Sequence, residues 1–188
     1  MISAIVYAKN GNFAAALTIA DGLEDGNVWL LSEIAVLQAR AGDGQAARQT
    51  LKAVLKAARE MDEALHRSEN MSIVAAAHAK AGYPQIAKKL LDEVQLTLEA
   101  ARKATSKDDA PQLIGTLSEI AGLQAEAGYA AMGIETALGV DVLSWSYYGE
   151  AQRVEALILV ARHLAGKPPL PWWYPQKENF FWSFLGIM

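Results

Sequence analysis

Apolar side chains recur three or four residues apart over most of the first 140 residues, with polar side chains between them. The intervening residues are rich in alanine, leucine, glutamate, lysine and arginine, all of which favour helix. Glycine and proline residues separate the apolar runs. The pattern predicts an all-α chain with helices over residues 2–10, 13–24, 27–41, 44–66, 69–81, 84–105, 111–127, 130–139 and 149–165.

Short polar residues and prolines mark several of the predicted helix starts. Asp43, Ser68 and Asp109 are predicted cap residues, because their side chains accept hydrogen bonds from the first free N–H groups of a helix. Pro84 and Pro111 suit a first helical turn, where a missing N–H group is not needed. The longest predicted helix, 44–66, would be about 35 Å long at 1.5 Å per residue.

A pattern of small residues repeats around four glycines, Gly11, Gly42, Gly82 and Gly128. Alanine stands seven and three residues before each glycine, and a small residue stands five residues after it. The two alanines fall on one face of a helix, where a second helix can approach closely. The glycine is expected to end the first helix in a left-handed conformation. Each unit is therefore predicted to be a helix–turn–helix, with a weaker fifth unit at Gly166.

This pattern resembles the tetratricopeptide repeat. The family places a small residue, an aromatic, a glycine, an alanine and a large apolar residue at the spacing seen here in Ala35, Gln38, Gly42, Ala47 and Leu51. Two further units hold the register with Ala75, His78, Gly82, Ala87 and Leu91, and with Ala4, Tyr7, Gly11 and Ala16. The resemblance implies a right-handed α-solenoid of antiparallel helix pairs, with about nine helices, over residues 1–166.

The chain departs from that family at two positions of the unit. The family tryptophan is replaced by Leu31, Met71 and Leu117, and the aromatic before the glycine survives only as Tyr7. The units are also longer than the 34 residues usual for the family. The chain is accordingly interpreted as tetratricopeptide-like.

The residue four positions before each glycine is the first candidate for binding, because the resemblance implies that this helix lines a concave groove. These ladder residues are Tyr7, Gln38, His78, Gln124 and, in the fifth unit, Arg162. Their polar side chains would bind a peptide by hydrogen bonds. The alternative is that they bridge neighbouring helices. Serines that recur six positions earlier are interpreted as helix-packing residues: Ser32, Ser72 and Ser118.

Residues 167–188 form a separate tail in which proline and aromatic residues are concentrated. Its aromatic residues are the second candidate site, since several large buried rings can anchor a complex: Trp172, Trp173, Tyr174, Phe180, Phe181, Trp182 and Phe184. Three interpretations stay open. The tail caps its own solenoid, or it docks on a partner protein or a second copy of the chain, or it inserts into a membrane surface.

Charge and residue content narrow the classes of function. The net charge is −4 without a basic stripe, so nucleic acid is not an expected partner. The absence of cysteine excludes disulfides and thiolate chemistry. His66, His78 and His163 lack metal-ligand spacing, so we expect neither a metal nor a cofactor. No apolar run is long enough to span a membrane and no secretory signal is evident, so a cytoplasmic location is expected.

These observations favour a protein-binding scaffold or accessory subunit that is not an enzyme. Its partner would be another protein or peptide, bound by the groove, the tail or both. One alternative is a small-ligand protein or an enzyme with a site in the groove, using His78 and carboxylates of adjacent units. The other is a peripheral membrane protein anchored by the tail.

Overall fold

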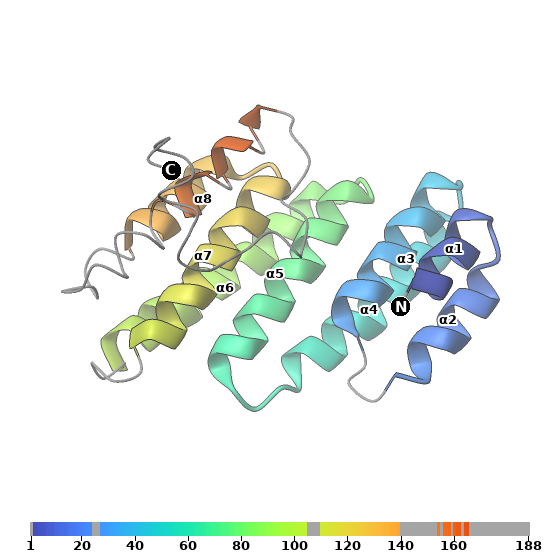
Figure 1. Cartoon of the computed structure of the whole chain (residues 1–188), viewed down its shortest axis with the longest axis horizontal. Coiled ribbons are helices and arrows are strands. Elements are labelled where there is room, and N and C mark those ends of the chain that lie inside the picture. Colours follow the sequence, from blue (N-terminus) through green and yellow to red (C-terminus); the bar gives the residue numbers. More distant parts are fainter. Residues whose placement is uncertain are drawn as a thin grey trace, which may run out of the picture.

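The computed structural model describes residues 2–23, 27–104 and 110–139, together with residues 154, 156–158, 160–162, 164 and 165. None of these residues is in a strand, and the all-α prediction is confirmed for this part of the chain. The helices are α1 (Ile2–Lys9), α2 (Phe13–Asp21), α3 (Val28–Arg40), α4 (Gly44–Arg59), α5 (Ala64–Lys80), α6 (Pro84–Ala104), α7 (Ala110–Glu126) and α8 (Ala130–Leu138) (Figure 1). The described residues between 154 and 164 are also helical.

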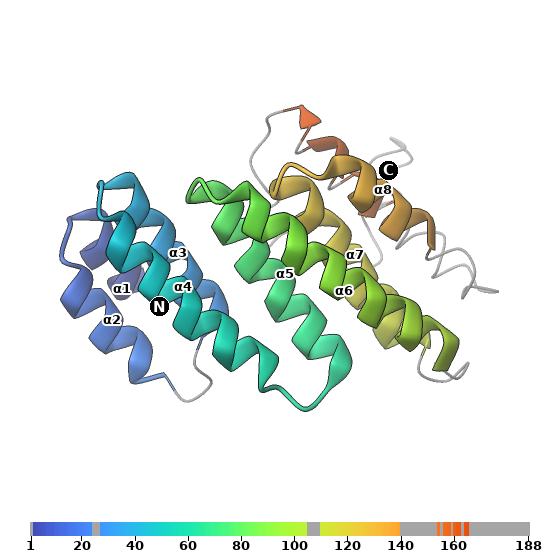
Figure 2. The ribbon, with the colours of Figure 1, turned by 180° about the vertical axis from the view of Figure 1, so that it is seen from behind.

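Consecutive helices pair into four hairpins, α1–α2, α3–α4, α5–α6 and α7–α8, which follow one another in a row (Figures 1 and 2). Contacts between successive odd-numbered helices, α1 with α3, α3 with α5 and α5 with α7, join the hairpins. Each even-numbered helix also contacts the odd-numbered helix that follows it. The odd-numbered helices therefore form the continuous layer of the molecule.

The two layers differ in how many of their faces are buried. Helix α3 buries seven of its side chains, which lie all around its axis: Val28, Leu30, Ser32, Ile34, Ala35, Val36 and Gln38. Helix α4 buries a single stripe at a spacing of three and four residues: Ala47, Leu51, Val54 and Ala58. The amphipathic pattern of α4 follows from its single buried stripe, whereas α3 is buried on several sides.

The four anchor glycines all form the predicted left-handed turn, with φ angles of 79°, 89°, 89° and 91°. In every case the glycine N–H donates to the carbonyl three residues back, and the next N–H donates to the carbonyl five residues back. For Gly82 these bonds join Gly82 N to Ala79 O at 3.0 Å and Tyr83 N to His78 O at 2.8 Å. Paired bonds of this kind satisfy carbonyl groups that the end of a helix leaves free.

Small residues fill the interior of each hairpin at the predicted offsets. The alanines seven residues before the glycines, Ala4, Ala35, Ala75 and Ala121, are all fully buried. In the last hairpin a glycine, Gly133, takes the place five residues after the anchor. A Cβ atom at Gly133 would lie 2.6 Å from the carbonyl oxygen of Ala121. Helices α7 and α8 are therefore too close at this point for any side chain.

Two tyrosines connect neighbouring hairpins in the same way. Tyr83 follows the anchor Gly82, and its hydroxyl donates to the carbonyl of Gly44 in the preceding hairpin at 3.2 Å. Tyr129 follows the anchor Gly128, and its hydroxyl donates to the carbonyl of Pro84 at 2.8 Å. In both cases the acceptor stands two residues after the preceding anchor glycine. The hairpins are thus joined at equivalent points despite their unequal lengths.

The prediction of one helix over 44–66 is wrong, because α4 ends at Arg59 and α5 begins at Ala64. The apolar stripe hides this break. Buried or partly buried residues continue at helical spacing through it, at Ala58, Met61, Leu65 and Ser68. The predicted cap Ser68 instead lies inside α5, where its hydroxyl donates to the carbonyl of Ala64 at 2.8 Å.

The other predicted helix starts agree better with the structure. Asp43 caps α4, and its side chain accepts from Ala46 N at 2.9 Å. Pro84 begins α6 and Pro111 lies in the first turn of α7, while Asp109 lies outside the described residues. The predicted helices 84–105 and 111–127 agree with α6 and α7 to within one residue at each end, since helix extends to Ala104 and resumes at Ala110.

Candidate functional site

Three of the ladder residues, Gln38, His78 and Gln124, are buried inside the helical layer, with exposed fractions of 3%, 6% and 0%. The Thr50 hydroxyl of α4 donates to Gln38 Oε1 at 2.9 Å. His78 Nδ1 donates to the Val74 carbonyl at 2.9 Å, and its ring contacts Tyr83 edge to face. Gln38 therefore bridges α3 and α4, while the hydrogen bond of His78 stays within α5.

The buried glutamine of the fourth unit takes part in a similar polar cluster. Gln124 Nε2 and the Thr136 hydroxyl both donate to Gln95 Oε1, at 3.4 and 3.3 Å. Thr136 stands eight residues after its anchor glycine, as Thr50 does in the second unit. The two units thus repeat a glutamine and a threonine on facing helices of a hairpin.

The remaining ladder residues do not share a surface with these three. Tyr7 is 44% exposed on α1. Arg162 is half-buried in the helical residues that follow α8. The structure does not bring the five ladder side chains together into one open row, and their role in binding stays a prediction.

The serines that recur six positions before the ladder are buried as expected of packing residues. Ser72 is fully buried and its hydroxyl donates to the Ser68 carbonyl at 2.8 Å. The Ser118 hydroxyl donates to the Ile114 carbonyl at 3.0 Å, and Ser32 is 2% exposed. None of the three reaches an open surface.

The outward face of the odd-numbered helices is formed by other positions, nine, five and two residues before each glycine. This open face comprises Val6 and Lys9 on α1, Glu33, Leu37 and Arg40 on α3, Ile73, Ala77 and Lys80 on α5, and Glu119, Leu123 and Glu126 on α7. All of them are exposed or half-buried except Ala77. Sequence reasoning missed this register, although a charged residue stands two positions before every anchor glycine.

Lys80 joins three helices across the open face. Its ammonium group lies 3.2 Å from Glu33 Oε1 on α3 and 2.7 Å from Glu126 Oε1 on α7. Burial would lower the pKa of Lys80, but hydrogen bonds and charge interactions with Glu126 and Glu33 outweigh it, so the pKa is raised above its ordinary value. The arrangement shows that α3, α5 and α7 present a common surface.

A cleft of about 820 Å³ is lined by residues around the start of α3 and the α4–α5 corner. These two regions lie at the end of the hairpins opposite the glycine turns (Figure 1). The residues before and at the start of α3 form one wall, and the α4–α5 corner and the first turns of α5 form the other. The lining residues are Leu23, Asn27, Val28, Trp29, Met61, Asp62, Glu63, His66, Asn70 and Ile73. Trp29 is 46% exposed, which is unusual for so large an apolar side chain.

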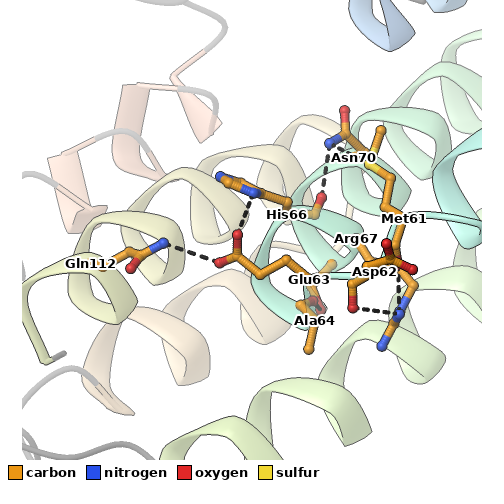
Figure 3. A network of polar contacts seen from close by, with 9 residues as sticks. Met61, Asp62, Glu63, Ala64, His66, Arg67, Asn70 and Gln112 are labelled. Carbon is orange, nitrogen blue, oxygen red and sulfur yellow. Dashed lines mark hydrogen bonds and ion pairs between the residues drawn. The ribbon is translucent and has the colours of Figure 1, made fainter. Parts of the chain in front are cut away.

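The α4–α5 wall of the cleft is held by side chains of α5 (Figure 3). Arg67 Nη1 donates to the Met61 carbonyl at 2.7 Å. Asn70 Nδ2 donates to the His66 carbonyl at 2.8 Å and lies 3.2 Å from Met61 Sδ. These contacts stabilise the corner at residues 60–63, which contains neither glycine nor proline. They could not be found from the sequence, because the side chains meet only after the backbone has turned.

Charge in the cleft is predominantly negative. Glu63 lies between His66 Nδ1, at 2.7 Å, and Gln112 Nε2 of α7, at 3.1 Å (Figure 3). The Asp62 carboxylate is exposed and has no hydrogen bond or ion pair with any described residue. Among the residues that the structure describes, no lysine or arginine lines the cleft. The cleft therefore combines an apolar surface with one engaged and one unengaged carboxylate.

The described side chains that the enzyme alternative would use are not gathered in the cleft. His78 does not line the cleft, and burial lowers its pKa although the bond to the Val74 carbonyl acts in the opposite direction. Within the described ranges, no cluster of three histidine or acidic side chains could hold a metal ion. His163 lies outside the residues with described side chains.

The tail candidates lie outside the described residues: Trp172, Trp173, Tyr174, Phe180, Phe181, Trp182 and Phe184. No helix in the described part of the chain is long and apolar enough to cross a membrane. Comparison of the chain with protein-family models, with curated proteins and with solved structures finds no match.

Proposed function

We propose that this chain is a tetratricopeptide-like, right-handed α-solenoid that acts as a scaffold and binds a segment of another protein in the cleft. The repeated arrangement supports the first part of the proposal. Four glycine turns share one hydrogen-bond pattern, and Tyr83 and Tyr129 join successive hairpins at equivalent points. Stacked helix pairs of this kind expose a long surface on one layer, which repeat proteins use for binding.

The cleft is the observation that carries the binding proposal. Its volume of about 820 Å³ lies in the range of about 300–1,000 Å³ typical of ligand sites. Trp29 on its wall is of the residue type most often found to dominate binding energy at protein interfaces. The adjoining open face, with Leu37 and Ile73 between charged side chains, extends the surface beyond the reach of a small molecule.

Site-specific photo-crosslinking tests this function. A benzophenone amino acid replaces Trp29 in the full chain, which is then irradiated in an extract of the source cells. We expect a discrete adduct with one protein. The matched control carries the same group at Leu96, which is 69% exposed on α6. An identical set of adducts from both positions, or none from position 29, would contradict the proposal.

A further inference from the structure

The cleft favours a particular chemistry of partner. We infer that it takes a peptide segment in which a large apolar side chain stands next to a lysine or arginine, an inference that rests on the proposed binding function. The apolar requirement follows from the bed of the cleft. Val28, Met61 and Ile73 are buried or half-buried there, and Trp29 stands exposed at the edge. Covering this bed removes apolar surface from water, which favours binding.

The preference for a cation follows from the balance of charges around the cleft. Asp62 and Glu63 are acidic, and none of the described lining residues is a lysine or an arginine. Among the nearby basic groups, Lys80 is paired with two carboxylates, and Arg67 donates to the Met61 and Asp62 carbonyls without an ion pair to either acidic side chain. Asp62, Glu63 and Arg67 together carry a net charge of −1, which an incoming ammonium or guanidinium group would meet.

Two features of the cleft favour a peptide whose lysine or arginine stands next to its large apolar side chain. The Asp62 carboxylate, without a partner among the described residues, is the free acceptor, because Glu63 is already held by His66 and Gln112. The Trp29 ring lines the same cleft. A basic side chain bound to the Asp62 carboxylate would share the cleft with Trp29, whose ring face also attracts cations.

A random peptide library displayed on phage tests this chemistry with the full chain as bait. We expect enriched peptides to carry lysine or arginine next to an aromatic or aliphatic residue roughly three times more often than the starting library, as one exposed ion pair allows. With Asp62→Lys as bait, the enrichment should shift to aspartate and glutamate. Glu135→Lys, with the same charge change at an exposed position of α8, should select the same peptides as the parent.

The outcomes separate this inference from the proposed function. Peptides that are lost on Trp29→Ser, retained on Leu96→Ser and show no basic preference would overturn the inference and leave the binding function standing. An Asp62→Lys bait that selects unchanged peptides would overturn it as well. A library from which no Trp29-dependent peptide is enriched would overturn both.

Discussion

At one end of the hairpins the chain turns at Gly11, Gly42, Gly82 and Gly128, and at the other end it turns between hairpins, as at residues 60–63. The glycine turns are alike in φ angle and in hydrogen bonds. The α4–α5 corner has no glycine and is held by Arg67 and Asn70. The cleft lies at this second end.

Under the proposed function, the two ends of the hairpins have different roles, one in stability and the other in binding. A turn made by backbone hydrogen bonds and one glycine can recur without change, because it depends on no distant side chain. A corner made by side-chain contacts is specific to its place in the chain. Its length and chemistry can therefore differ between hairpins. The proposed binding site lies at such a corner.

The largest effect on the regular part of the molecule is expected from Gly133→Ala. The new Cβ atom would lie 2.6 Å from the Ala121 carbonyl oxygen and 3.2 Å from Val160 Cγ2. Backbone cannot yield as a flexible side chain does, so we expect a loss of about 2–3 kcal/mol in the free energy of unfolding. Urea denaturation followed by circular dichroism measures it. Unchanged stability would mean that α7 and α8 are further apart than described.

A smaller effect is expected at the glycine turn itself. Gly82→Ala forces a side chain onto a backbone with φ of 89° and should cost about 1–2 kcal/mol. Gly115→Ala is the matched control, because Gly115 lies inside α7 with nothing within 4 Å of its added Cβ atom. That variant should instead gain about 0.5–1 kcal/mol from better helix propensity. Equal shifts in melting temperature for both variants would contradict the assigned turn.

The side-chain-built corner should respond locally. Arg67→Met removes the hydrogen bond to the Met61 carbonyl and should cost about 1 kcal/mol globally. Amide hydrogen exchange of residues 60–63 should rise more than that of residues 81–83 at the next glycine turn. Arg59→Met is the control, since its ion pair with Glu93 is about half exposed and contributes little. Equal increases in hydrogen exchange in both segments would contradict the prediction that Arg67 acts locally on the α4–α5 corner.

The smallest effect concerns pH and the buried ladder residue His78. Its pKa is lowered from 6.5 in the folded state, so the unfolded chain binds the proton more readily. The resulting stability is present above about pH 6.5 and is lost as pH falls below it. Thermal melts at about pH 7.5 and 5.5 should show a smaller pH-dependent loss for His78→Gln than for the parent. An equal loss in both proteins would count against a buried neutral histidine.

Most of the helices and all four glycine turns could be predicted from the sequence, because their causes are local. Helical spacing, the Asp43 cap and the preference of glycine for positive φ all act within a few residues. The α4–α5 break could not be predicted, since the apolar stripe through Met61 and Leu65 continues at helical spacing. Propensity alone gives no reason to stop a helix there.

The candidate site shows the same division. The sequence indicated the small-residue interior and the polar ladder, but it did not indicate that the ladder side chains Gln38, His78 and Gln124 would be buried. Only the packing of α3, α5 and α7 decided which helix face stays open. Which face is exposed depends on the helices that pack against each side, and this packing cannot be read from any single residue.

The sequence by itself determined the helical units, their glycine turns and the close approach of paired helices, since each follows from backbone conformation and side-chain size within a unit. Tertiary structure alone placed Trp29 and Asp62 in one cleft and set Lys80 between two carboxylates of other helices. These residues are 33 to 47 positions apart in the chain, and they come together only once the hairpins have stacked. The cleft is therefore a property of the stack, formed where the regular turns are absent.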